Sequence, residues 1–170
     1  MSSNATARPR PGRGLRLMLR VPVLLYRLGF AGQLGERDIM LLTTTGRRSG
    51  RQRVSGLNYA VDGATVYVAA GWGPRTGWYQ NLLAKPEVAV QIGRRRLAAR
   101  GRPVTDASEA ARACALLEVA SPRGGPPKAL RPLLSRLGFD FDSERAQAFR
   151  EPAKLTMVAL ALGAPPAPTD

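Results

Sequence analysis

The chain has 170 residues, a length that fits one compact domain, and its 44% hydrophobic and 22% charged residues are typical of a globular protein. It contains no histidine and a single cysteine, Cys114. This composition excludes an intrachain disulfide, histidine-dependent nucleophilic catalysis and histidine-ligated haem, and we expect no metal site. No uninterrupted apolar run is long enough to span a bilayer, including that at residues 21–25.

The formal net charge is +14, and all but three of the 26 basic residues are arginine. The excess is concentrated in residues 1–27, 46–53 and 94–102, none of which contains an acidic residue. Such segments on an otherwise near-neutral chain indicate an anionic partner: a phosphate, an acidic ligand or a membrane surface. The alternative is that these arginines are only solvated, as runs of charge usually are.

The two ends of the chain are rich in proline and in small or polar residues, and we predict that residues 1–13 and 163–170 are disordered tails. Residues 14–162 then form a single domain. The start of the chain shows no clear signal-peptide cleavage site, so we expect a cytoplasmic location.

Residues 14–31 predict a helix that is kinked or started by Pro22 and carries Arg16, Arg20 and Arg27 on one side. Two interpretations are open. The helix packs on the domain and keeps its arginines in water, or it makes a peripheral contact with an anionic membrane.

Strands and turns alternate over most of the remaining chain. The dipeptide Asp62-Gly63 is a hairpin-turn signal, segment 71–77 is too rich in glycine for regular structure, and Thr105 or Asp106 with Glu109 forms a helix-capping signal. The predicted strands are residues 39–45, 52–61, 64–70, 87–92, 95–104 and 154–162, and the predicted helices are residues 78–84, 106–120, 129–137 and 143–149. This order predicts an α+β domain built on a small antiparallel barrel, which hides the strand edges.

The loop Gly46-Arg47-Arg48-Ser49-Gly50 carries hydrogen-bond donors suited to a phosphate. Its glycines allow a tight backbone, and two guanidinium groups and a hydroxyl supply charged and neutral donors. It is not a P-loop, because the GxxxxGK[ST] spacing is absent. An ordinary hairpin loop with exposed arginines is the alternative interpretation.

A second candidate is the glycine-rich segment 71–77, which leads into Trp78 and Tyr79. A helix that begins after such a loop presents free N–H groups, and the aromatic side chains offer flat surfaces for a ring. The alternative is that Trp78 and Leu82, four residues apart, form the core face of a short helix. We predict that Cys114 is a core residue of a later helix.

Several segments together resemble one known family. The motifs are LLTTTGRRSG at 41–50 followed by Arg53, AGWG at 70–73, WYQNL at 78–82, KPEV at 85–88 and VQIG at 90–93. In this order, over about residues 26–105, the sequence resembles the deazaflavin (F420)-dependent nitroreductases. The resemblance implies a split β-barrel related to FMN-binding oxidoreductases, with F420 as the cofactor and FMN as the alternative.

The resemblance also implies where the cofactor binds. Three stretches match the family's loop for the phosphate tail, the strand that passes the cofactor, and the loop and helix start beside its ring. They are, in that order, Arg47, Arg48, Ser49 and Arg53; Ser55, Gly56 and Leu57; and Ala70, Gly71, Trp72, Trp78 and Tyr79. No catalytic residue is implied; Tyr59, Tyr67 and Tyr79 are candidate proton donors, with solvent as the alternative.

The activity implied is that of an F420H2-dependent reductase, which passes a hydride to a small organic acceptor such as a quinone, an enone or a nitro compound. A homodimer would suit a cofactor held in a groove between subunits. Gly56, where the family usually has proline, and the lack of a lysine near Gly71 motivate a second hypothesis: a non-catalytic carrier of F420, a flavin or a lipid. The net charge motivates a nucleic-acid-binding module, but no motif for one occurs and we expect no such partner.

Overall fold

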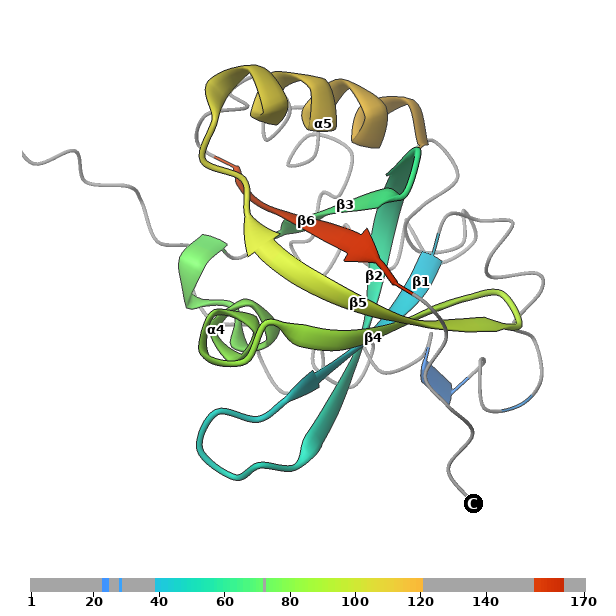
Figure 1. Ribbon diagram of the computed structural model, residues 1–170, viewed down its shortest axis with the longest axis vertical. Helices are drawn as coiled ribbons and strands as arrows, with labels where there is room; N and C mark the ends of the chain where they lie inside the picture. Colours follow the sequence, from blue (N-terminus) through green and yellow to red (C-terminus); the bar gives the residue numbers. More distant parts are fainter. Residues whose placement is uncertain (1–22, 25–27, 29–38, 72, 121–154, 164–170) are drawn as a thin grey trace, which may run out of the picture.

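In the part of the chain that the computed structural model describes, residues 23–24, 28, 39–71, 73–120 and 155–163, six antiparallel strands close into a barrel (Figure 1). One helix lies across its outer face and another at one end. In chain order the elements are β1 (Ile39–Thr45), β2 (Gln52–Asp62), β3 (Thr65–Ala70), the 3-10 helix η1 (Gly73–Arg75), α4 (Gly77–Ala84), β4 (Glu87–Ile92), β5 (Arg95–Pro103), α5 (Ala107–Ala120) and β6 (Thr156–Leu162).

The strand order around the barrel is β1-β2-β3-β6-β5-β4, and β4 pairs with β1 to close it. β1–β2, β2–β3 and β4–β5 pair as hairpins, whereas β3 and β4 do not pair and β6 inserts between β3 and β5. Closure gives each described strand a partner on both sides, which removes the open edges that invite aggregation. The predicted α+β fold with a six-stranded barrel is thereby confirmed.

The barrel interior is filled by apolar side chains that alternate along the strands. Met40 and Leu42 of β1 are fully buried, as are Val66 and Val68 of β3. This spacing of two follows from the pleat of a strand, which turns successive side chains to opposite faces. The next inward residue of β1, Thr44, is polar and only 1% exposed, and it lies where β1 runs into the following loop.

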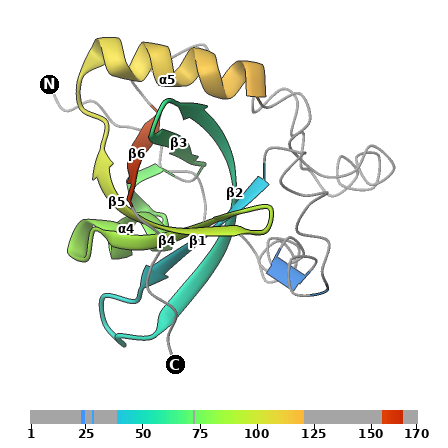
Figure 2. The ribbon, with the colours of Figure 1, turned by 45° about the vertical axis from the view of Figure 1, so that its right-hand side comes forward.

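α5 lies across the outer face of β2 and β3 (Figure 2). The cluster beneath it consists of Ala60, Tyr67, Ala110, Ala113, Cys114, Leu117, Met157 and Ala159. Cys114 is 3% exposed, which confirms that it is a core residue, and burial raises the pKa of its thiol. A buried thiol with a raised pKa is a poor nucleophile.

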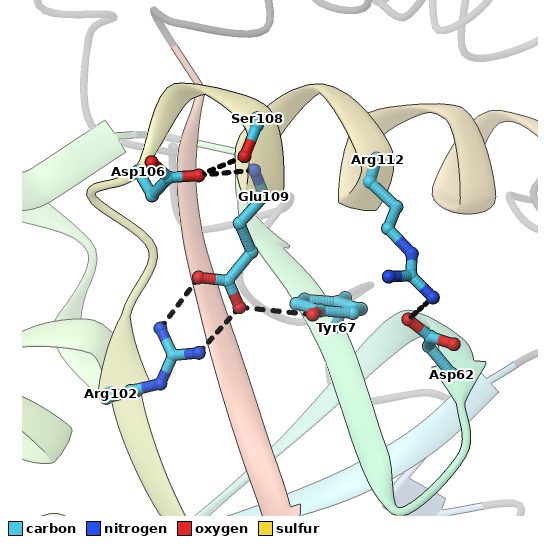
Figure 3. A network of polar contacts seen from close by, with 7 residues as sticks. All are labelled: Asp62, Tyr67, Arg102, Asp106, Ser108, Glu109 and Arg112. Carbon is cyan, nitrogen blue, oxygen red and sulfur yellow. Dashed lines mark hydrogen bonds and ion pairs between the residues drawn. The ribbon is translucent and has the colours of Figure 1, made fainter.

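The first turn of α5 is tied to the barrel by a network of polar contacts (Figure 3). One carboxylate oxygen of Asp106 accepts a hydrogen bond from the N–H of Glu109 at 2.8 Å and another from the hydroxyl of Ser108 at 2.5 Å. The Glu109 carboxylate accepts two bonds from Arg102, at 2.6 and 2.9 Å, and one from the hydroxyl of Tyr67 at 3.1 Å. Asp106 therefore caps the helix as predicted, while the glutamate fastens it to β3 and β5.

α4 packs across β1 and β5 at the end of the barrel where β4 begins. It inserts Trp78, Tyr79 and Leu82 into the interior cluster. Gly101 of β5 makes room for this, because a Cβ at that position would clash with Cδ1 of Leu82 and lie 2.9 Å from its Cγ. The glycine is needed here for close approach of the helix.

The predicted boundaries agree with the structure to within about two residues at most element ends. The exception is segment 71–77, where Gly73–Arg75 form η1 in place of an irregular loop. Pro74 fixes its φ angle near the helical value, and both the N–H and the hydroxyl of Thr76 donate to the carbonyl of Gly73, at 3.1 and 2.7 Å. The proline and the two bonds of Thr76 therefore stabilise a helical turn in spite of the glycines.

Some predicted segments lie outside the described residues. They are residues 1–13, all of 14–31 except 23, 24 and 28, residues 129–137 and 143–149, and all of 163–170 except 163. Among the residues that are described, no helix is both long and apolar enough to cross a membrane.

Candidate functional site

Two loops adjoin α4 at one end of the barrel (Figures 1 and 2). Residues 46–51 join β1 to β2, and residues 71–76 lead from β3 through η1 into the helix. Across these two loops and α4 the sequence contains arginines and no acidic residue. The arginines of these two loops therefore have no acidic neighbour within the loops or α4, and Glu87 at the start of β4 pairs with Arg100.

The loop after β1 has a fixed backbone and exposed side chains at its tip. The N–H of Gly46 donates to the carbonyl of Arg51, and the N–H of Gly50 donates to the carbonyl of Gly46, both at 2.8 Å. Gly50 has φ +67°, a conformation that side chains disfavour. Arg47, Arg48 and Ser49 are exposed at the tip, so their donors face solvent from a defined frame.

α4 holds this loop through Asn81, a residue to which the sequence assigned no role. Its side-chain oxygen accepts bonds from the N–H of Arg47 at 3.2 Å and from Nη1 of the same arginine at 3.3 Å. Its amide nitrogen donates to the hydroxyl of Thr44 at 3.3 Å, and that hydroxyl donates to the carbonyl of Arg53 at 3.4 Å. The signal in the sequence is one polar residue between Trp78 and Leu82 on the buried side of α4.

Three predicted site residues of β2 form a row on its inward face. Strand pairing places Arg53 opposite Thr44, Ser55 opposite Leu42 and Leu57 opposite Met40, whose side chains all face the interior. Leu57 packs against the interior cluster, Ser55 is half-buried and Arg53 is exposed. The row thus leads from the basic loop into the barrel.

Gly56 does not belong to this row. It pairs with Leu41 on the outward face of the same two strands. Gly56 therefore lies on the opposite face of β2 from Ser55 and Leu57, because successive residues of a strand point to opposite faces.

The aromatic residues of α4 are packed rather than presented. Trp78 is 8% and Tyr79 9% exposed, and their rings meet edge to face with centroids 6.2 Å apart. Ala70 is buried in the same interior cluster, whereas Gly71 is exposed. Trp72 lies outside the described residues. This placement fits the interpretation in which Trp78 and Leu82 form a core face.

The three candidate proton donors lie in two different clusters. Tyr59 and Tyr79 are buried in the barrel interior. Tyr67 lies on the outer face beneath α5, where burial and the hydrogen bond to Glu109 raise the pKa of its hydroxyl. The structure does not bring the three together.

The side chains at the basic loop fit an anionic tail. Charge-assisted bonds from guanidinium groups and a hydroxyl are the donors that bind phosphates, and the loop places Arg47, Arg48 and Ser49 in consecutive exposed positions. The same residues offer no nucleophile with an activating base. The chemistry of a reaction at this end would then have to come from a bound cofactor.

The fold is that of a split β-barrel. A structural likeness with TM-score 0.50 and 12% identity links it to a putative 5-nitroimidazole antibiotic resistance protein from Bacteroides thetaiotaomicron, covering 76% of this chain and 75% of that one. An F420-H2 dependent reductase, FDR-A, aligns with TM-score 0.48 and 23% identity over 75% of this chain and 95% of that one.

Residues 20–124 match the model of the F420H(2)-dependent quinone reductase family, and the chain belongs to that family. It is 37% identical over 95 residues to F420H(2)-dependent quinone reductase Rv1261c of Mycobacterium tuberculosis. The same identity holds for the putative F420H(2)-dependent quinone reductase Mb1292c of Mycobacterium bovis. The matched region spans 51% of this chain and 63% of the length of these relatives. The predicted membership of an F420-dependent reductase family is confirmed.

Proposed function

We propose that the chain is an F420H2-dependent reductase that passes a hydride to a small organic acceptor, with quinones as the first class of acceptor. The observation that supports this most is the exposed Arg47-Arg48-Ser49 tip on a backbone fixed by α4, in a chain of this family. When bound, the reduced deazaflavin supplies the hydride. The protein contributes binding, orientation and exclusion of water.

Each group of residues has a distinct role in this proposal. Arg47, Arg48 and Ser49 bind the phosphate tail through charge-assisted bonds. Arg53 and Ser55 line the inward face of β2 beyond it. Trp78 and Tyr79 support the site by holding α4 in the barrel, since little of either ring is exposed.

Solvent is the proposed source of the one proton that, together with the hydride, converts a quinone into a quinol. Tyr59 and Tyr79 are buried in the interior, and the hydroxyl of Tyr67 is bonded to Glu109 under α5. The raised pKa of Tyr67 also makes it a weaker acid than a free tyrosine.

Titration of the purified protein with F420 and, separately, with FMN tests the proposal, with cofactor fluorescence as the signal. We expect saturable binding of F420 at micromolar concentration or below, followed by oxidation of F420H2 when a quinone is added. Binding of FMN but not of F420 would mean that FMN is the cofactor. Bound F420 without turnover of quinones, enones or nitro compounds would favour a carrier.

The combined substitution Arg47→Ala and Arg48→Ala should weaken F420 binding by at least about tenfold, because each charge-assisted bond contributes about 1.5–3 kcal/mol. The measurement is the dissociation constant by fluorescence. The melting temperature should stay near the wild-type value, since both side chains are exposed. An unchanged affinity would remove these arginines from the site.

Two further interactions remain predictions. A homodimer would be seen by analytical ultracentrifugation. Membrane contact through residues 14–31 would be seen as co-sedimentation with anionic vesicles, which is lost in a chain that starts at Gly32.

A further inference from the structure

We infer that Asn81 is a positioning residue, which sets the guanidinium of Arg47 where the anionic tail of the cofactor binds. The inference rests on the proposed function of the basic loop. It assigns to α4 a role beyond filling the barrel end, carried by one buried amide. Asn81 does not touch the cofactor in this proposal and acts through Arg47.

The contacts of Asn81 are those of a clamp on one arginine. Its oxygen accepts from both the backbone N–H and the Nη1 of Arg47, at 3.2 and 3.3 Å, so main chain and guanidinium are fixed together. A guanidinium has five donor hydrogens, and this contact uses one, which leaves the rest for an anion. Arg47 is exposed, so packing against the domain does not order its side chain.

The other side of the amide is held as firmly. Asn81 is 8% exposed, and its nitrogen donates to the hydroxyl of Thr44, which is 1% exposed and itself donates to the carbonyl of Arg53. The chain of bonds joins α4 to β1 and β2, the two strands that flank the loop. The oxygen therefore has a fixed position from which to orient Arg47.

Packing of the barrel end alone does not explain an amide at this point of α4. Asn81 lies between Trp78 and Leu82, which are packed in the apolar interior, and an apolar side chain of similar size would fill the space. Replacing both members of a buried polar pair, here Asn81 and Thr44, by apolar groups is often neutral for stability, whereas removing one member leaves the other without its partner. What the amide adds is a directed contact to an exposed cation.

The test combines two variants of Asn81 with a double-mutant cycle. Asn81→Leu removes both bonds to Arg47, while Asn81→Asp keeps an acceptor of the same shape and places a negative charge against the guanidinium. F420 affinity is measured by fluorescence, and amide hydrogen exchange of residues 46–51 is measured without cofactor. Leu83→Ala, at an exposed position of the same helix, is the control.

We expect Asn81→Leu to weaken F420 binding about fivefold to tenfold and to speed exchange of the Arg47 amide at least about tenfold. Asn81→Asp should keep that amide protected and still weaken binding, because the carboxylate neutralises the guanidinium. Combining Asn81→Leu with Arg47→Ala should weaken binding by less than the sum of the two single losses, whereas combination with Arg48→Ala should be close to additive. Leu83→Ala should change neither measurement.

Additive losses in the cycle with Arg47→Ala, or an unchanged exchange rate of the Arg47 amide in Asn81→Leu, would overturn the inference. If Asn81→Leu does not fold, Asn81→Ala, which also removes both bonds to Arg47, takes its place in the cycle. A wild-type protein that binds no F420 would overturn the proposed function and the cofactor part of this inference together. In that case the exchange rates still decide whether Asn81 holds Arg47.

Discussion

At the scale of single residues, one glycine decides how closely α4 can approach the barrel. Gly101 faces Leu82, which is 1% exposed and cannot swing into solvent, and Cδ2 of Leu160 lies 3.1 Å from the position of an added Cβ. Close packing leaves no room to relax such a contact. The glycine thereby also determines how close to the barrel Asn81 lies, because α4 carries that residue.

Gly101→Ala should destabilise the protein by about 1–3 kcal/mol, the usual cost of overpacking a core. Urea denaturation measures the change in the free energy of unfolding. The double variant with Leu82→Ala should lose less stability than the two single changes together, because the smaller side chain removes the clash.

Gly77→Ala serves as the matched control. Its added Cβ would meet no atom within 4 Å, and it lies at the exposed start of α4. Its stability should match or exceed that of the wild type, since alanine is the better helix former. Equal losses in the two alanine variants would contradict the role given to Gly101.

At the scale of elements, α5 is attached by charges as well as by its apolar face. The bond from Arg102 lowers the pKa of Glu109, with help from the hydroxyl of Tyr67. The hydroxyl of Ser108 and the N–H of Glu109 lower the pKa of Asp106. A second ion pair, between Arg112 and Asp62 at 2.7 Å, joins the same helix to β2 (Figure 3).

A lowered carboxylate pKa makes stability depend on pH with a definite sign. Between the folded and the unfolded pKa the unfolded chain binds more protons, so stability rises with pH there. The contribution of Glu109 is fully present above its ordinary pKa of 4.5 and is lost as pH falls through the lowered value. Glu109→Gln should therefore flatten the pH dependence of the free energy of unfolding below about pH 5.

Denaturant titrations at several pH values between about 3 and 7 make this measurement. Glu118→Gln, at an exposed position of the same helix, is the control and should keep the wild-type slope. A slope in Glu109→Gln equal to that of the control would show that the contact with Arg102 does not stabilise α5.

The sequence predicted elements better than it predicted contacts between them. The strands were predictable because each shows alternating or continuous apolar character between turn signals, and Gly63 does adopt φ +59° in its turn. The capping role of Asp106 is local and was also predictable. The partners of Glu109 were not, because Tyr67 is 42 residues away in the chain and only the barrel brings them together.

In the candidate site, too, the sequence predicted local features but not the contacts between elements. The basic tip Arg47-Arg48-Ser49 is visible as a motif, and the structure exposes it. The link from Arg47 to Asn81 spans 34 residues and depends on the docking of α4, so the motif alone could not show it. The burial of Trp78 and Tyr79 likewise depends on that docking, which the sequence left as one of two interpretations.

At the scale of the whole molecule, the β1–β2 loop and the arginine-rich turn between β4 and β5 lie at opposite ends of the barrel. The arginine-rich turn between β4 and β5 projects away from α4, and the β1–β2 loop lies beside α4 (Figures 1 and 2). β4 has six residues, which corresponds to about 20 Å of extended chain. This is more than twice the screening length of about 8 Å at physiological salt.

The combined substitution of Arg94, Arg95 and Arg96 by alanine should leave F420 affinity within about twofold of wild type at about 0.15 M salt, because their charges are screened from the site. This triple substitution removes three positive charges, whereas the change at Arg47 and Arg48 removes two. The comparison therefore shows whether F420 affinity depends on where the charges lie or on the net charge of the protein. Fluorescence titration makes the comparison. A loss as large as that of the pair would mean that the whole positive field, rather than the loop, attracts the cofactor.

The place of β6 in the barrel has a consequence for how the protein is made. β3 and β5 are both complete by residue 103, but the strand that fills the gap between them is residues 156–162. If the other five described strands pair during synthesis, the facing edges of β3 and β5 stay unpaired until β6 emerges from the ribosome. Such edges attract other strands, so this interval is when a chaperone would protect the growing polypeptide most.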